Sequence, residues 1–221
     1  MRVERFDTRE ALDAALASRL RTVIETGGAL MLSGGNTPRP AYMALGTQGL
    51  QPARDLSVLF SDERYVPRDS EASNYHASLP LLDTLRLSEE RVLRVRTELP
   101  LDEAVADYEH RLSQLLDVQK TVRLGVLGLG ADGHTASLFS QADLERAHGR
   151  LAVAVRRPDG MHAVSVTPGF LAKVSQLLIV VPGQDKREAL AALLARDPQL
   201  VAWRAVANSA DVAVWCGRID V

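Results

Sequence analysis

A glycine-rich segment past the middle of the chain combines side chains that could do acid–base chemistry. In GLGADGHTASLF, Asp132 and His134 stand among three glycines. These glycines, Gly128, Gly130 and Gly133, have the G-x-G-x-x-G spacing of a turn that binds a dinucleotide pyrophosphate. Alternatively, the histidine takes a proton from water near neutral pH, while the carboxylate orients its ring and stabilises the imidazolium. The same segment therefore predicts either a nucleotide loop or a catalytic loop.

The nucleotide interpretation needs a feature that the chain lacks. The sequence predicts a strand, the glycine turn and a following helix, but a dinucleotide site also needs an acidic residue at the end of the next strand. That strand ends instead in Arg156 and Arg157, which could accept only the extra phosphate of NADP. Asp132 would also place a negative charge beside the pyrophosphate. We therefore favour a catalytic loop over a nucleotide loop, and over a histidine that only caps a helix.

A second glycine pair follows a predicted strand nearer the N-terminus. In SGGNTP, Gly34 and Gly35 allow the backbone to turn tightly and approach a ligand. Thr37 is placed to cap the next helix, with Pro38 in its first position. A glycine loop before a helix N-terminus suits an anion, although it could equally be a simple turn.

Charged side chains directly follow two further apolar segments. Asp62, Glu63 and Arg64 come after LSVLF, where they could form a solvated ion pair or place a carboxylate beside an anion-binding guanidinium. Lys186 comes after LLIVV and opens an amphipathic helix. A lysine there is unfavourable beside the helix dipole unless an anion binds. Lys186 is therefore either a substrate contact or a flexible exposed side chain.

Short apolar runs alternate with amphipathic stretches along the chain. Helices are predicted over Thr8–Glu25, with Thr8 as the N-cap, and over Asp102–Asp117, whereas Ser70–Leu79 and the stretch around Gly160 are predicted to be irregular. Strands are predicted at Ala29–Ser33, Leu56–Phe60, Val122–Leu127, Leu151–Val155, His162–Thr167, Leu177–Val181 and Val212–Cys216. Continuous apolar strands separated by helices are typical of a mostly parallel sheet covered on both faces. We therefore predict an α/β fold, a three-layer α/β/α sandwich.

The predicted sheet brings the polar residues to one edge. In an open parallel sheet, ligands bind outside the carboxyl ends of the strands. Four such ends carry glycines, carboxylates, a histidine and cations. We therefore expect a single site for a small anionic substrate, in one domain over residues 1–221.

Composition argues against several other classes of protein. The net charge is −2 and the basic residues are scattered, so we expect no nucleic-acid or membrane partner. The single cysteine, Cys216, excludes an internal disulfide and a cysteine-based zinc site. His134 with Asp62 and Asp132 could hold zinc only weakly, without a second well-spaced histidine, so we expect no metal and no cofactor. The charged N-terminal segment and the lack of a long apolar run predict a cytoplasmic protein.

Several motifs, taken in order, resemble those of one enzyme family. SGGNTP, SDERYVPRDSEASNYH, GLGADGHTASLF and PGQDK are similar to segments of 6-phosphogluconolactonases, and the resemblance runs from about Gly28 to Lys186. These hydrolases of the pentose phosphate pathway are related to glucosamine-6-phosphate deaminase and ribose-5-phosphate isomerase. The resemblance implies a modified Rossmann-like fold without a nucleotide, and hydrolysis of 6-phospho-D-glucono-1,5-lactone to 6-phospho-D-gluconate.

The resemblance also implies roles for individual residues. His134 would be the general base that activates water, with Asp132 as its supporting carboxylate. Arg64 and Lys186 would bind the substrate's phosphate, and Arg64 would also steady the developing oxyanion. The sugar-phosphate pocket would be lined by Gly34, Gly35, Asn36, Thr37, Asp62 and Asn74. This chemistry needs an oriented water, a base and an oxyanion stabiliser, not a covalent nucleophile or a metal.

The chain departs from the family at one anion contact. Many lactonases have an arginine at the start of the strand that reads HAVSVT here, and this chain has Ala163 at that position. The contact is therefore missing or is supplied by Arg156 or Arg157.

Two other functions remain as alternatives. The deaminase-like aldose–ketose isomerases share the glycine loop, the aspartate and the histidine, but they carry a glutamate where this chain has Phe139, and Asp-Glu-Tyr where it has DER. A sugar-phosphate-binding sensor would normally carry a helix-turn-helix, for which the roughly 25 residues before the first strand leave no room. We therefore predict a lactonase that acts on a small molecule, as a monomer or small homo-oligomer.

Overall fold

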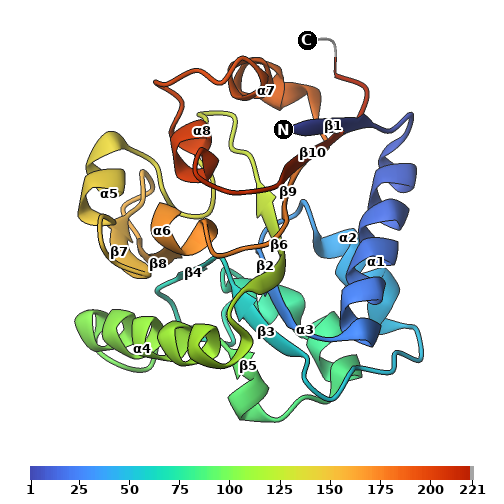
Figure 1. Cartoon of the computed structure of the whole chain (residues 1–221), viewed down its shortest axis with the longest axis vertical. Coiled ribbons are helices and arrows are strands. Elements are labelled where there is room, and N and C mark those ends of the chain that lie inside the picture. The colour runs from blue at the N-terminus through green and yellow to red at the C-terminus, as the bar shows by residue number, and fades with distance from the viewer. Residues whose placement is uncertain (220–221) are drawn as a thin grey trace.

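Within residues 1–219, which the computed structural model describes, the central sheet has seven strands and all of them are parallel. Their order is β1-β10-β9-β6-β2-β3-β5 (Figure 1). The strands are β1 (Arg2–Arg5), β2 (Ala29–Leu32), β3 (Ser57–Phe60), β5 (Val92–Leu93), β6 (Val122–Gly128), β9 (Leu177–Val181) and β10 (Val212–Cys216). The predicted parallel sheet is confirmed, with two edge strands, β1 and β5, that were not predicted.

Helices cover both faces of this sheet, as Figure 1 shows. One face packs against α1 (Arg9–Thr26), α2 (Arg39–Gly46) and α3 (Asn74–Leu85), and the other against α4 (Leu101–Gln119), α6 (Pro168–Leu171), α7 (Arg187–Leu194) and α8 (Val201–Val206). Three further helices are α5 (Gln141–Arg146), η1 (Glu89–Arg91) and η2 (Gln184–Lys186). The predicted three-layer sandwich is therefore confirmed. None of the helices described is long and apolar enough to cross a membrane.

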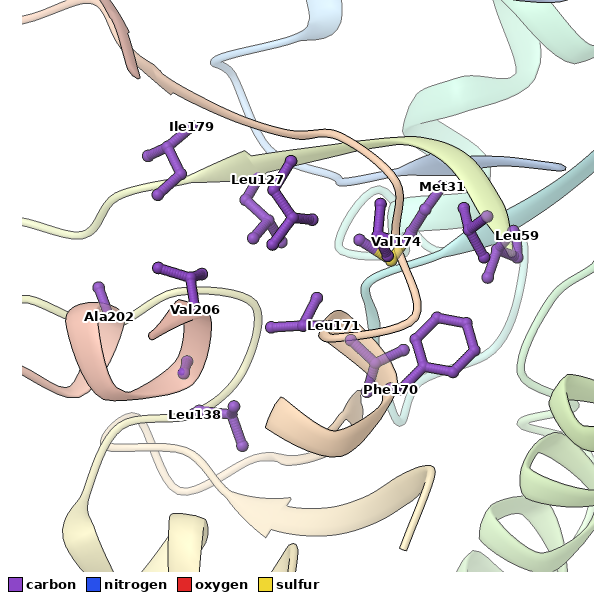
Figure 2. Packing of buried hydrophobic residues seen from close by; sticks show 14 of the residues in the cluster. Met31, Leu59, Leu127, Leu138, Phe170, Leu171, Val174, Ile179, Ala202 and Val206 are labelled. Carbon is purple, nitrogen blue, oxygen red and sulfur yellow. The ribbon is translucent and has the colours of Figure 1, made fainter. Parts of the chain in front are cut away.

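The two sides of the inner strands of the sheet supply the two apolar cores. In β2, Leu30 and Leu32 pack with the core of α1, α2 and α3, whereas Ala29 and Met31 belong to the core on the other face. Figure 2 shows Met31 beside Leu59 in that second core. A buried strand therefore needs a continuous apolar run, which is the pattern that predicted it.

The starts of the first two helices differ in how well they were predicted. Thr8 caps α1 as predicted, because its side chain accepts a hydrogen bond from the backbone N–H of Ala11 (3.1 Å). The prediction that Thr37 caps α2 is wrong. Pro38 occupies the cap position, where no side chain bonds to the helix. Thr37 instead faces the cavity described below.

One segment predicted to be irregular is partly helical. Ser70–Leu79 contains the start of α3, and Ser73 caps this helix by accepting a hydrogen bond from His76 N–H (3.1 Å). Pro80 lies inside α3, and because proline removes a backbone donor it usually argues against a helix. The stretch around Gly160, predicted to be irregular, is a tight turn with φ of 87° at the glycine.

Two strands predicted for the main sheet belong to a small antiparallel sheet of order β4-β8-β7. β7 (Ala152–Arg156) and β8 (His162–Val166) form a hairpin, and β4 (Asp62–Arg64), which was not predicted, pairs with β8. The segment 157–161 is too short for a crossover between parallel strands, which takes a dozen or more residues. The predicted place of these two strands in the parallel sheet is therefore wrong.

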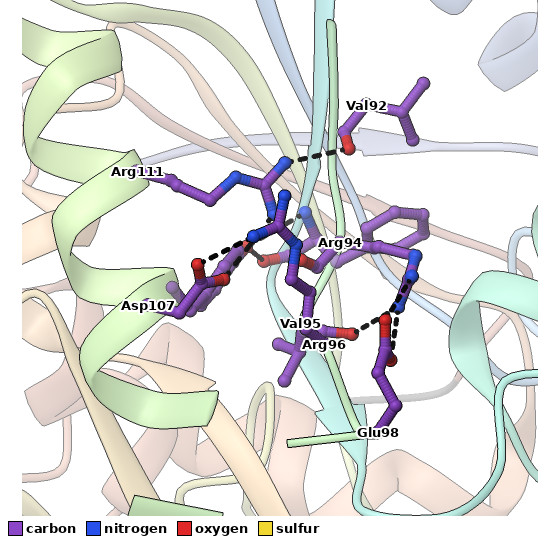
Figure 3. Close-up of polar contacts among 9 residues, drawn as sticks. Val92, Arg94, Val95, Arg96, Glu98, Asp107 and Arg111 are labelled. Carbon is purple, nitrogen blue, oxygen red and sulfur yellow. Dashed lines mark hydrogen bonds and ion pairs between the residues drawn. The ribbon is translucent and has the colours of Figure 1, made fainter. Parts of the chain in front are cut away.

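Arginine side chains cover the edge of the sheet at β5, as Figure 3 shows. Arg111 of α4 donates hydrogen bonds to the carbonyl oxygens of Val92 (3.2 Å) and Arg94 (2.9 Å). Arg96 pairs with Asp107 of α4 at 3.1 Å. These contacts occupy carbonyl groups at an edge that could otherwise pair with another chain. The cluster therefore has a structural role at the edge of the sheet.

Candidate active site

A cavity of about 330 Å³ lies where β9, β6, β2 and β3, neighbours in the sheet, reach their carboxyl ends. It is lined by Ser33, Gly34, Gly35, Asn36, Thr37, Asp62, Arg64, Asn74, Gly128, Leu129, Gly130, His134, Ala136, Arg157 and Lys186. All predicted site residues except Asp132 are among them. A larger hollow, of about 600 Å³, lies at the opposite end of β3, where Ser57 lines it. The position of the smaller cavity at the strand ends is the one expected for a ligand.

His134 and Asp132 form a hydrogen-bonded pair beside the cavity. Nδ1 of His134 lies 2.5 Å from Oδ1 of Asp132, and the backbone N–H of His134 donates to the same oxygen (3.2 Å). Partial burial would raise the pKa of the Asp132 carboxyl, but the hydrogen bonds and charge of His134 outweigh it and lower this pKa below its ordinary value. The side chain of Asp132 is 56% exposed, so it supports the ring from outside the cavity. Such a carboxylate orients a histidine and stabilises its protonated form.

The glycines of the loop make room for this pair. A Cβ at Gly130 would overlap Nδ1 of His134 and Oδ1 of Asp132. The loop closes on itself, because Gly130 N–H donates to the His134 carbonyl (2.9 Å) and Gly133 N–H to the Gly130 carbonyl (3.1 Å). The prediction of a helix directly after this turn is wrong, since the next helix, α5, begins only at Gln141. The loop therefore lacks the helix N-terminus on which a dinucleotide pyrophosphate would sit.

Arg64 and Asn74 form a second hydrogen-bonded unit on the cavity wall. Nη1 of Arg64 donates to the backbone oxygen of Ala72 (2.7 Å) and to Oδ1 of Asn74 (3.3 Å), whose amide donates to the Asp62 carbonyl (2.9 Å). A Cβ at Gly34 would overlap the Asn74 side chain, so the close approach of this loop to α3 requires glycine. The guanidinium is thereby held in place, and it has five N–H donors, enough to bind an anion as well.

Glu63, which precedes Arg64, does not line the cavity. Its carboxylate accepts hydrogen bonds from the N–H groups of Asn74 (2.6 Å) and Tyr75 (2.8 Å) and from the hydroxyl of Ser73 (3.1 Å). Burial raises the pKa of Glu63 to about 7, and these hydrogen bonds oppose the shift. Glu63 therefore anchors the start of α3, and with it Asn74, instead of pairing with the Arg64 guanidinium.

Asp62 lines the cavity, but its carboxylate is already hydrogen-bonded. It accepts hydrogen bonds from the hydroxyls of Ser61 (2.8 Å) and Ser137 (2.7 Å), and the residue is buried. Over residues 1–219, no cluster of three or more His, Cys, Asp or Glu residues is placed to hold a metal ion. The structure therefore does not gather Asp62, Asp132 and His134 as zinc ligands.

Two further cations and a serine complete the wall. Nζ of Lys186, at the end of η2, donates to the Leu129 carbonyl (2.8 Å). Of the two arginines considered for the missing anion contact, Arg157 lines the cavity and Arg156 is exposed and does not. Ser33 was not predicted, yet it is buried, and its hydroxyl has no hydrogen-bond partner in the part of the chain described. Its place at the end of a predicted strand was the signal for it.

Known proteins resemble the chain in both sequence and structure. The family model for glucosamine-6-phosphate isomerases/6-phosphogluconolactonase matches residues 5–215. A 6-phosphogluconolactonase of Synechocystis is 35% identical over 188 residues, which cover 81% of this chain and 78% of that protein. The human 6-phosphogluconolactonase is 30% identical over 206 residues, which cover 86% and 80%. A crystal structure of 6-phosphogluconolactonase from Thermotoga maritima has a TM-score of 0.84 at 26% identity, covering 98% of each chain.

A monomeric glucosamine-6-phosphate deaminase also has this fold. Its TM-score is 0.81 at 19% identity, covering 99% of this chain and 98% of that one. At this identity the likeness concerns the fold alone, whereas the family match spans most of the chain. The chain belongs to the glucosamine-6-phosphate isomerase/6-phosphogluconolactonase family.

Proposed function

We propose that the chain is a 6-phosphogluconolactonase, which hydrolyses 6-phospho-D-glucono-1,5-lactone to 6-phospho-D-gluconate in the pentose phosphate pathway. The observation that carries this proposal is the His134–Asp132 pair beside a cavity that also holds Arg64 and Lys186. The relatives of this name, at 35 and 30% identity, support the same activity.

His134 is the general base of the proposed reaction. Because Asp132 holds Nδ1, Nε2 is the nitrogen that takes a proton from water as its oxygen attacks the lactone carbonyl. The Arg64 guanidinium stabilises the resulting oxyanion. When the ring C–O bond breaks, the imidazolium returns its proton to the leaving ring oxygen, and the new carboxylic acid ionises in water. No cofactor or metal takes part in this scheme.

The phosphate of the substrate is bound by Lys186 and Arg64, in a pocket formed by the Gly34–Thr37 loop with Asp62 and Asn74. The hydrogen bond of Lys186 to the Leu129 carbonyl supports this, because it holds the ammonium at the cavity wall. The single cysteine of the chain supports a reducing compartment, and we propose that the enzyme works in the cytoplasm as a monomer or small homo-oligomer.

The deaminase-like alternative is less well supported by the site. Phe139 stands where those enzymes carry a glutamate, and its ring packs on His134 with the centroids 4.4 Å apart. A phenyl ring cannot exchange the proton that opening of a sugar ring requires.

The proposal is tested by following hydrolysis of 6-phosphogluconolactone, generated in situ, by NMR, with the spontaneous rate subtracted. His134→Ala should lower kcat on the order of 10²- to 10⁴-fold, the contribution typical of general-base catalysis. His148→Ala, at an exposed histidine on another loop, is the matched control and should keep full activity.

Two results would contradict the proposal. A wild-type rate equal to the spontaneous rate would contradict the proposed lactonase activity. The two alternatives would then be tested by measuring turnover of glucosamine 6-phosphate and binding of sugar phosphates. Full activity in His134→Ala would keep the proposed lactonase activity but show that His134 is not its general base.

A further inference from the structure

We propose that Arg157 binds the substrate's phosphate as a third cation, leaving its ion pair with Asp159 to do so. This inference rests on the proposed function and extends it to a residue that makes the site selective for phosphorylated lactones. Four observations support it, and they concern its backbone, its burial, its neighbours and its charge.

The backbone of Arg157 is fixed at the turn of the β7–β8 hairpin. Its N–H donates to the Met161 carbonyl (2.8 Å), and its carbonyl accepts from the Gly160 N–H (2.9 Å). The side chain is only 15% exposed, although most arginines on hairpin turns extend into water. It lines the cavity. The hairpin therefore places this guanidinium at the site.

The guanidinium lies against the catalytic histidine's neighbour. Its central carbon is 5.3 Å from the centroid of the Phe139 ring, which in turn packs on His134 at 4.4 Å. Arginine stacks well on aromatic faces, and this contact restricts the directions in which the side chain can turn. A single aromatic ring, that of Phe139, therefore lies between Arg157 and the proposed base, His134.

Of the three cations that line the cavity, Arg157 is the one paired with a carboxylate in the part of the chain described. Arg64 and Lys186 donate to backbone carbonyls, whereas the side chain of Arg157 is paired with the Asp159 carboxylate, at 3.0 Å. Asp159 is 41% exposed, and its pKa is lowered by its hydrogen bond to Arg157 and also by the charges of Arg157 and Arg64. Only the carboxylate end of this ion pair is open to water, so Asp159 can turn into solvent while another anion takes its place at the guanidinium.

A phosphate dianion is the ligand that best replaces Asp159. It offers more charge and more oxygen acceptors than a carboxylate, and the planar guanidinium can donate two parallel hydrogen bonds to it. With Arg64 and Lys186 it would then be surrounded by three cations. Asp62, the acid on the cavity wall, has its oxygens engaged by two hydroxyl groups, so it offers Arg157 less competition.

The test compares Arg157→Met with Arg156→Ala. Methionine keeps an unbranched apolar chain against Phe139 and removes the charge, while Arg156 is the exposed neighbour that does not line the cavity. We expect Arg157→Met to raise KM for 6-phosphogluconolactone roughly 10-fold or more, as for loss of a charge-assisted hydrogen bond. Its kcat/KM for unphosphorylated glucono-1,5-lactone, and both values in Arg156→Ala, should stay near those of the wild type.

Binding of 6-phosphogluconate, followed by calorimetry, tests the same residue without turnover. Arg157→Met should weaken this binding, Arg157→Lys should restore part of it, and Asp159→Asn should strengthen it. Equal affinity in wild type and Arg157→Met would overturn the inference, and weaker binding in Asp159→Asn would overturn the exchange with Asp159. An inactive wild type whose binding still depends on Arg157 would contradict only the proposed hydrolysis.

Discussion

At the scale of single residues, the ring of His134 is restrained on two sides. Asp132 bonds to Nδ1, and the ring of Phe139 lies against the imidazole with the centroids 4.4 Å apart. A general base must gain a proton and lose it again in each cycle. In the proposed reaction these two contacts would orient the ring, and with it Nε2, for that task.

Lys186 provides the prediction at this scale. Lys186→Ala should raise KM for the phosphorylated lactone more than it lowers kcat, because its ammonium would bind the phosphate equally in the ground state and the transition state. Steady-state kinetics measure both constants, and Lys173→Ala, at an exposed lysine of another loop, is the control. An unchanged KM in Lys186→Ala would remove this residue from the site.

At the scale of elements, the site joins two sheets. The parallel sheet supplies the glycine loops and His134, whereas the small antiparallel sheet carries Arg64 on β4 and Arg157 beside β7. Glu63 then ties β4 to the start of α3, which positions Asn74. The loops of the site also depend on glycine, because a Cβ at Gly34 would overlap the Asn74 side chain and a Cβ at Gly130 would overlap the His134–Asp132 pair.

Gly130→Ala tests how far the loop determines catalysis. The added Cβ would overlap the His134–Asp132 pair, so kcat should fall at least tenfold while the fold remains. Gly49→Ala is the matched control, because a Cβ there meets no atom of the described chain within 4 Å. Circular dichroism checks the fold, and a Gly130→Ala enzyme of normal kcat would show that the pair can shift without loss.

At the scale of the whole molecule, one apolar core links the two sheets. Val153 and Val164 of the small sheet belong to the same buried cluster as Leu127 and Ile179 of the main sheet, with Phe170 of α6 fully buried within it (Figure 2). Because the core is shared, we predict that the chain unfolds as one domain in a single cooperative transition.

Phe170→Ala tests this prediction. Removing a fully buried phenyl ring should lower the free energy of unfolding by about 3–5 kcal/mol and move the whole transition without splitting it. Urea unfolding followed by circular dichroism and by fluorescence of Trp203 and Trp215 measures this. Val118→Ala, at an 81% exposed side chain, should change stability by less than about 0.5 kcal/mol. Two separate transitions would contradict a single domain.

The local pattern of the sequence determined most of the helices and strands, and it also determined which polar residues follow the strands. The apolar runs of β2, β6 and β9 and the cap of α1 at Thr8 are properties of neighbouring residues, so they could be predicted without the fold. The rule that ligands bind at the carboxyl ends of parallel strands then placed His134 and Lys186 near one another.

Only the tertiary structure decided how these groups meet. The pairing of β4 with β8, the buried bonds of Glu63 and the choice of Arg157 over Arg156 depend on residues far apart in the chain. A strand's apolar pattern says which face is buried, but it does not say which strand lies beside it or in which direction. Pairing direction and register are set by the length of the connections and the packing of the whole core, and these appear only when the chain has folded.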